Sequence, residues 1–174
     1  MRSVRTVTPN KVIVDTDILS MFAKADAIEA LVEAFGSWEP HMTPAIRDEI
    51  MVPFQYGFNF PKKVLDTIPT VVLTQEMMED YLALSVAERS VGRGELEAIV
   101  YCRNTGALFA TNDAHARAFA QAQGINVISL QAILRILWEE RGWPKRQVSV
   151  LLERIRKADR LTLSPEVEAE IFEE

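Results

Sequence analysis

The sequence is poor in the residues that form disulfides and zinc sites. Its 174 residues include one cysteine, Cys102, and two histidines, His41 and His115. A single cysteine excludes an internal disulfide, and these three side chains cannot assemble an ordinary Cys/His zinc site. Cys102 falls in an apolar helical pattern, which favours a small buried hydrophobe over a catalytic nucleophile. Any metal bound by this chain is therefore expected to have oxygen ligands.

Long apolar runs are also missing. Charged residues interrupt every hydrophobic stretch well before the roughly 20 residues that a helix needs to cross a bilayer. The N-terminal segment, residues 1–10, has two arginines but no apolar region typical of a secretory signal. We therefore expect no membrane-spanning helix and a cytoplasmic location.

Positive charge is scarce overall but concentrated in one segment. The net charge of −6 argues against broad adhesion to nucleic acid. Eight of the 19 Lys and Arg nevertheless lie between positions 135 and 160: Arg135, Arg141, Lys145, Arg146, Arg154, Arg156, Lys157 and Arg160. This basic segment could steer a phosphate backbone. It could equally be the solvated face of helices.

Short apolar runs alternate with helical patterns along most of the chain. The runs expected to form strands are 11–15, 41–43, 71–73, 107–110 and 126–128. Such alternation predicts an α/β fold, with three α/β/α layers around a mostly parallel sheet of about five strands. Residues 51–70 are rich in aromatics and proline without a clean period, so a loop with one turn of helix is expected there.

The same patterns suggest how the chain is divided. We expect an N-terminal extension over 1–10, one α/β domain over 11–140 and a C-terminal helical extension over 141–174. Two helices are predicted in that extension, at 144–158 and 165–172, the second with Ser164 as its N-cap.

Two acids follow predicted strands. Asp15 comes directly after the first apolar run, and Asp113 follows the run at 107–110. In an open parallel sheet, ligands bind beyond the carboxyl ends of the strands, where these side chains would lie. Two further acids, Glu49 and Glu95, stand near the starts of predicted helices. Taken singly, the aspartates could be helix caps and the glutamates solvated helix residues.

Crowded carboxylates repel one another, and burial raises their pKa values. A divalent cation removes that conflict. Mg²⁺ and Mn²⁺ take oxygen ligands and keep several waters, and such ions support hydrolysis of phosphodiesters.

Four motifs together resemble the PIN-domain family of nucleases over about residues 11–140. They are Ile-Val-Asp15-Thr-Asp-Ile-Leu-Ser, Ala-Ile-Arg-Asp-Glu49-Ile, Gly94-Glu95-Leu-Glu-Ala-Ile-Val and Ala-Thr111-Asn112-Asp113. The resemblance implies cleavage of RNA with Mg²⁺ or Mn²⁺, leaving 5′-phosphate and 3′-hydroxyl ends. Many members of the family have Asp at the third acidic position. The Gly94-Glu95 form found here is similar to that of an archaeal and bacterial subgroup.

The resemblance also implies residue roles. Asp15, Glu49, Glu95 and Asp113 would be the catalytic acids, with Asp15, Glu95 and Asp113 as metal ligands. Residues that could contact these acids and hold them in place are Asp17, Glu97, Thr111 and Asn112. Asp17 and Glu97 could equally be ordinary acids in the first turn of a helix.

The resemblance suggests partners as well, because many relatives are toxins neutralised by an antitoxin protein. It implies an RNA substrate, a possible antitoxin and a homodimer. The aromatic stretch 54–60 could stack RNA bases, but it could also fold onto the core or form a homodimer contact. His115 is interpreted as a solvent-facing helix residue rather than a general acid.

Two other functions remain open at this stage. One is a PIN-like binding or scaffolding module with little catalysis. The other is a phosphatase of the haloacid dehalogenase type, because Asp15-Thr16-Asp17 follows a strand. Leu19 stands where that family has Thr or Val, and Asp113 lacks the family's usual paired acid, so the phosphatase is the weaker hypothesis.

Overall fold

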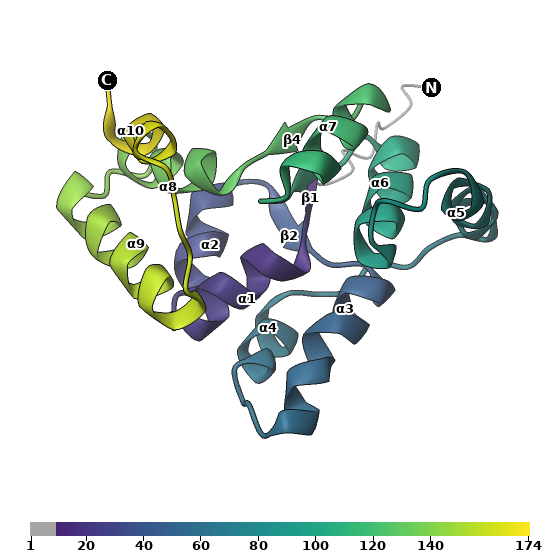
Figure 1. The fold of residues 1–174 in the computed structure, drawn as a ribbon, viewed down its shortest axis with the longest axis horizontal. Coiled ribbons are helices and arrows are strands. Elements are labelled where there is room, and N and C mark those ends of the chain that lie inside the picture. Colours follow the sequence, from purple (N-terminus) through teal and green to yellow (C-terminus); the bar gives the residue numbers. More distant parts are fainter. Residues whose placement is uncertain (1–9) are drawn as a thin grey trace, which may run out of the picture.

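A parallel sheet of four strands lies between two layers of helices in the computed structural model, which describes residues 10–174 (Figure 1). The strand order is β2-β1-β3-β4. The strands are β1 (Lys11–Val14), β2 (Glu39–His41), β3 (Leu108–Ala110) and β4 (Val127–Ile128). This confirms the predicted α/β class. The extension expected over 1–10 lies outside the described residues, apart from Asn10.

The strand order distributes the helices over the two faces, because crossovers between parallel strands are right-handed as a rule. The chain moves from β1 to β2 in one direction, through α1 (Thr16–Lys24) and α2 (Ile28–Phe35). It then returns past β1 to β3 and on to β4, which places α6 (Arg93–Thr105) and α7 (Ala114–Ala122) on the opposite face. After β4, α8 (Leu130–Glu139) comes back to pack against α2.

The core explains why β1 is central. Val12, Ile13 and Val14 are all fully buried, as expected for a parallel strand that is covered on both faces. The C-terminal helices belong to the same packed structure, since α9 (Lys145–Asp159) contacts α1 and α10 (Pro165–Phe172) contacts α8. The Ser164 hydroxyl accepts a hydrogen bond from the Val167 N–H, which confirms the predicted N-cap.

The strand expected at 71–73 is wrong. The described residues show only an isolated bridge between Met42 and Thr70, followed by a segment in which Val72 is 85% exposed. Thr74 then caps α5 (Gln75–Ala87) by accepting a hydrogen bond from the Met77 N–H. The second strand also begins earlier than expected, because Lys11 pairs with Glu39.

The prediction of a loop with one turn of helix at 51–70 underestimates the helical content of this segment. After α3 (Pro44–Met51), the chain forms a 3₁₀ turn, η1 (Val52–Tyr56), and a helix, α4 (Pro61–Thr67). The spacing of buried Pro61, Val64 and Ile68 provides α4 with an inward face. The surrounding aromatics and prolines obscure that spacing in the sequence.

No helix within residues 10–174 is long and apolar enough to span a membrane.

Candidate active site

Asp15 lies at the carboxyl end of β1, where the chain turns from Val14 into α1. Its backbone N–H donates to the Ala110 carbonyl of β3 at 2.9 Å. One carboxylate oxygen, Oδ1, accepts from the Thr16 N–H at 2.8 Å, and Oδ2 accepts from the Thr111 hydroxyl at 2.9 Å. The residue is only 4% exposed. Asp15 therefore both caps α1 and stands at the edge of the sheet where ligands are expected.

Burial raises the pKa of Asp15 from 3.8 to about 7. The negative charge of Glu95 adds to this increase, and that of Asp17 contributes less. Hydrogen bonds from Thr111 and Thr16 act in the opposite direction, because they stabilise the ionised carboxylate. The remaining upward shift means that ionising Asp15 in the metal-free protein is costly.

Thr111 connects Asp15 to Asp113. Besides donating to Asp15, its hydroxyl oxygen accepts from the Asp113 N–H at 3.2 Å, and the side chain is fully buried. Asp113 is the N-cap of α7, where its Oδ1 accepts from the Ala116 N–H at 2.8 Å. Asn112 is half-buried between Thr111 and Asp113. The two strand-end acids predicted from the sequence are thus joined through one hydroxyl.

Glu49 reaches the other acids from α3. Its Oε2 accepts from the Thr16 hydroxyl, and its Oε1 accepts from the Gly94 N–H at 3.2 Å. A Cβ at position 94 would lie 2.7 Å from Oε1 and 3.0 Å from Oε2. Glycine is therefore needed there, because any side chain would push the Glu49 carboxylate away from the start of α6.

Glu95 begins the same helix. Its Oε2 accepts from the Gly92 N–H at 3.0 Å, as in a capping box. Burial raises the pKa of Glu95, the Gly92 hydrogen bond lowers it, and the charges of Asp113, Asp17 and Glu49 raise it further. Glu95 thus experiences the charges of acids from three other elements.

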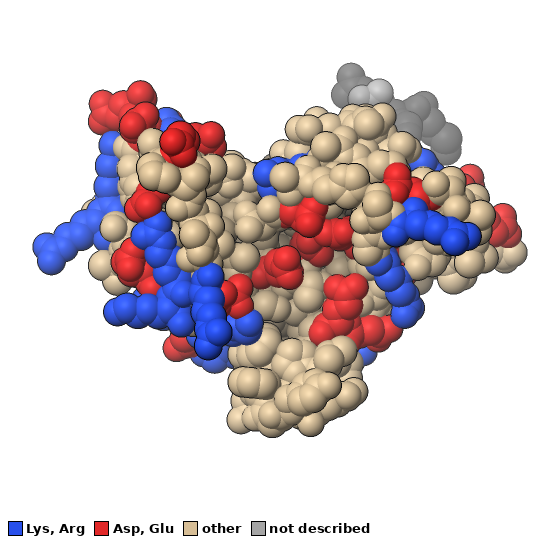
Figure 2. Space-filling model, in the orientation of Figure 1, with Lys and Arg blue, Asp and Glu red and all other residues tan. Residues whose placement is uncertain are grey.

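Asp17, in the first turn of α1, completes the group. Burial is the main reason that the pKa of Asp17 is raised. The charges of Asp159, Asp113 and Glu49 raise it further, while that of Lys24 lowers it. We call the five acids that influence one another in this way the acidic hollow: Asp15, Asp17, Glu49, Glu95 and Asp113. Figure 2 shows acidic side chains along a hollow in this face of the molecule, whereas Lys and Arg gather over α9.

Glu97 occupies a different place. It is 8% exposed, and its Oε1 accepts from the Ala45 N–H at 2.7 Å, in the first turn of α3. It therefore binds the helix that carries Glu49 rather than lying in the acidic hollow.

The acids suit a hydrated divalent ion. Among residues 10–174, no three Asp, Glu, His or Cys side chains lie close enough together to hold a metal ion directly. Glu49, Glu95 and Asp113 each use one carboxylate oxygen to accept from a backbone N–H. Oxygen donors with net negative charge nevertheless match Mg²⁺ or Mn²⁺, and Mg²⁺ usually keeps several of its waters. The donor set therefore fits an ion bound partly through water.

Two contributors were not anticipated from the sequence. The Thr16 hydroxyl and the Gly94 N–H both hold Glu49, and only the position of Gly94 next to Glu95 could have suggested its part. His115 is exposed and lies 2.8 Å from the Ser90 hydroxyl. Cys102 is buried, and burial raises the pKa of its thiol well above the usual range, in agreement with the predicted structural role.

Comparison with known proteins assigns the chain to a family. No curated protein matches the sequence. The family DUF3368, described as a PIN domain, matches residues 11–174 and so includes every element that contributes to the acidic hollow. PIN domains are generally nucleases and typically use divalent metals. The chain belongs to the PIN-domain family.

Proposed function

We propose that this protein is a metal-dependent endoribonuclease that hydrolyses RNA phosphodiester bonds at the acidic hollow. The observation that carries the proposal is the buried Asp15, whose pKa is raised to about 7 beside other acids. Such an arrangement is unfavourable in the free protein, and perturbed acids in a hollow are typical of functional sites. A bound divalent cation would remove the repulsion.

Each acid has a distinct part in this proposal. Asp15, Glu95 and Asp113 hold Mg²⁺ or Mn²⁺, directly or through its waters. Glu49, which is exposed and fixed by Gly94, orients the attacking water. The ion, when bound, withdraws charge from the phosphate and lowers the pKa of a water. Attack of water on phosphorus breaks the bond to the 3′ oxygen, which leaves as a hydroxyl, and the other product keeps a 5′-phosphate.

Supporting residues keep the acids in place. Thr111 fixes the Asp15 carboxylate from β3, and its contact with the Asp113 backbone sets the spacing of the two aspartates. Glu97 anchors the start of α3 through Ala45, and thereby positions the helix that presents Glu49.

Divalent cation should be required for RNA binding at the acidic hollow as well as for cleavage. The protein carries a net charge of −6, and this hollow contributes five acids to it. Without the ion, a phosphate would meet only negative charge there. EDTA should therefore abolish any RNA affinity that depends on Asp15 or Asp113.

The test is cleavage of a mixed, end-labelled RNA pool by the full chain with Mn²⁺ or Mg²⁺. Cleavage by the wild type should disappear in EDTA and fall sharply in Asp15→Asn and Asp113→Asn. The matched control is Asp66→Asn, an exposed aspartate on α4 that pairs with Lys62 outside the hollow. Its cleavage should equal that of the wild type.

The products distinguish the competing functions. Fragments that a ligase accepts directly carry 5′-phosphates, as the proposed reaction requires. RNA binding without cleavage, whichever divalent ion is added, would indicate a scaffolding module instead. Release of inorganic phosphate from small phosphoesters would indicate a phosphatase, and either result would overturn the proposal.

A more specific role is part of the same hypothesis. By resemblance to the family, the protein would be the toxin of a toxin–antitoxin pair and would form a homodimer. A short neighbouring reading frame encoding a DNA-binding protein that suppresses the cleavage activity would support this role. Sedimentation of the purified chain measures its oligomeric state.

A further inference from the structure

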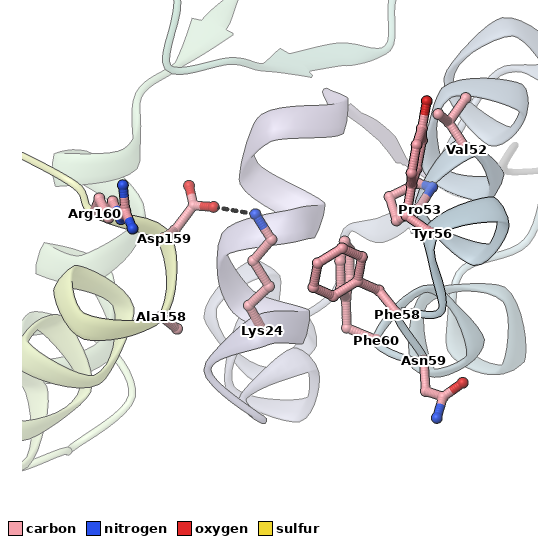
Figure 3. Close-up of a pocket in the computed structure, with 10 residues that line it drawn as sticks. All are labelled: Lys24, Val52, Pro53, Tyr56, Phe58, Asn59, Phe60, Ala158, Asp159 and Arg160. Carbon is pink, nitrogen blue, oxygen red and sulfur yellow. Dashed lines mark hydrogen bonds and ion pairs between the residues drawn. The ribbon is translucent and has the colours of Figure 1, made fainter.

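A second hollow adjoins the acidic one. It is a cavity of about 780 Å³ between the last turn of α1, the η1–α4 segment and the end of α9 (Figure 3). Its walls differ from those of the acidic hollow, since they combine aromatic rings with cations. We call it the aromatic groove and define it by Lys24, Tyr56, Phe58, Phe60 and Arg160.

The aromatic wall is unusually open to solvent. Tyr56 is 75% exposed and Phe58 is 57% exposed, while Phe60 is partly buried against the core. The rings of Phe58 and Phe60 lie 6.4 Å apart at 55°. Exposed aromatics that cluster beside a cavity mark a site where something else covers them. Flat faces of this kind suit the stacking of a planar group.

The opposite wall is positively charged. Lys24 forms an ion pair with Asp159, and its Nζ lies 5.2 Å from the centre of the Phe60 ring. Arg160 ends α9 in an exposed position and forms no ion pair with any residue between 10 and 174. With two cations and one acid, the lining has a net charge of +1. This local charge is opposite in sign to that of the acidic hollow and of the whole protein.

Helix α1 connects the two hollows. Asp17 in its first turn belongs to the acidic hollow, and Lys24 in its last turn lines the aromatic groove. At 1.5 Å of rise per residue, these positions are about 10 Å apart along the helix. An extended strand lying along α1 would reach both.

We propose that the aromatic groove binds an unpaired RNA base, stacked on Tyr56 or Phe58, with the adjoining phosphate on Arg160. This inference rests on the proposed function, because it assigns the groove to the strand that the acidic hollow cuts. The exposed cation Arg160 beside flat, exposed rings matches the phosphate and base of one nucleotide, which favours RNA as the occupant. Aromatic faces beside cations are the usual means of binding single strands without sequence preference. The groove thus selects unpaired RNA and places it beside the site of hydrolysis.

Binding is measured separately from cleavage. A fluorescein-labelled, mixed-sequence RNA of single strands is titrated with the full chain in EDTA, and fluorescence anisotropy is recorded. The probe has no ion to hold it at the acidic hollow, so this affinity depends on the groove, and Asp66→Asn, outside both hollows, should leave it unchanged. A chain that binds RNA through the groove but does not cleave it with any divalent ion would contradict the nuclease proposal alone. Cleavage with binding that is indifferent to the groove would contradict this inference alone.

Three variants test the groove. Tyr56→Leu and Phe58→Leu keep an apolar side chain but remove the flat face, and each should weaken binding at least about fivefold. The matched control is Phe54→Leu, in the same segment and 39% exposed but outside the groove lining. It should bind as the wild type does.

Arg160→Gly separates charge from structure. Arg160 has φ 53°, a left-handed conformation that glycine adopts more readily, so this variant should fold at least as well as the wild type. It should weaken RNA binding and reduce the dependence of log Kd on log salt by about 0.7. Lys157→Ala, an exposed cation on α9 outside the groove lining, is the control for total charge.

Several outcomes would overturn the inference. These are unchanged affinity in both aromatic variants, equal loss in the Phe54 control, or equal binding of fully duplex RNA, which offers no unpaired base. A groove that instead joins two copies of this chain would show unchanged RNA affinity together with a dimer that dissociates in Phe58→Leu. The inference is supported if the wild type binds single strands more tightly than duplex RNA and the groove variants bind single strands more weakly.

Discussion

Asp15→Asn should stabilise the metal-free protein while sharply reducing the proposed RNA cleavage. A pKa raised from 3.8 to about 7 means that the ionised carboxylate is disfavoured in the fold by about 4 kcal/mol at pH 8. Asn resembles the neutral acid in shape. It loses the stronger hydrogen bonds that a charged group accepts from Thr16 and Thr111, which offsets part of the gain. A net gain of about 1 to 4 kcal/mol is expected.

The sign of the pH dependence follows from the same shift. Between pH 3.8 and about 7 the folded protein holds a proton on Asp15 that the unfolded chain releases, so wild-type stability falls as pH rises through this window. By pH 5 only about 1.6 kcal/mol of that loss has occurred. The advantage of Asp15→Asn should therefore be larger at pH 8 than at pH 5.

Urea unfolding followed by circular dichroism measures this at pH 5 and pH 8 in EDTA, with Asp66→Asn as the exposed control. Mn²⁺ should then stabilise the wild type at pH 8 and leave Asp15→Asn almost unchanged, because binding to the folded state alone shifts stability. A variant that is less stable than the wild type at pH 8 in EDTA would refute the reasoning.

Two further predictions concern the helices that present the acids. Gly94→Ala places a Cβ 2.7 Å from Glu49 Oε1 and should lower kcat/KM for RNA cleavage roughly 10- to 100-fold, whereas Gly92→Ala, whose Cβ meets Glu95 Oε2 at 3.4 Å, should change it little. Glu97→Ala leaves the Ala45 N–H without its acceptor and should cost about 1 to 3 kcal/mol of unfolding free energy. Glu97→Gln keeps the accepting oxygen and should lose less, and equal losses in urea titrations would contradict the assigned hydrogen bond.

The sheet and its strand-end acids were accessible from the sequence because they depend on local patterns. Three apolar residues before Asp15 suffice to predict a buried strand, and parallel strands bring their carboxyl ends to one edge. The caps at Asp15 and Asp113 depend on residues only a few positions away. Such features need no knowledge of distant contacts.

Contacts between distant segments were not accessible. The Glu97 bond to Ala45 spans 52 residues, and the Gly94 bond to Glu49 spans 45. Neither pairing is visible until α3 and α6 pack together. The same holds for the aromatic groove, because the segment around Phe58 meets the end of α9 across more than 100 residues of sequence. Its rings could be noted in advance, but their exposure and their opposing cations could not.

From the sequence, Asp15 and Asp113 could be either helix caps or active-site acids. The structure shows why the two roles are compatible. Asp113 uses Oδ1 for its cap and Glu95 uses Oε2, so within residues 10–174 their second oxygens make no hydrogen bond. Helix N-termini favour negative charge and partly offset the crowding of these acids. Asp15 differs from these two residues, since both its oxygens accept hydrogen bonds and its pKa still rises to about 7. Burial is the main cause of that rise and the charge of Glu95 adds to it, so a cation in the hollow would stabilise the ionised form of this one buried acid.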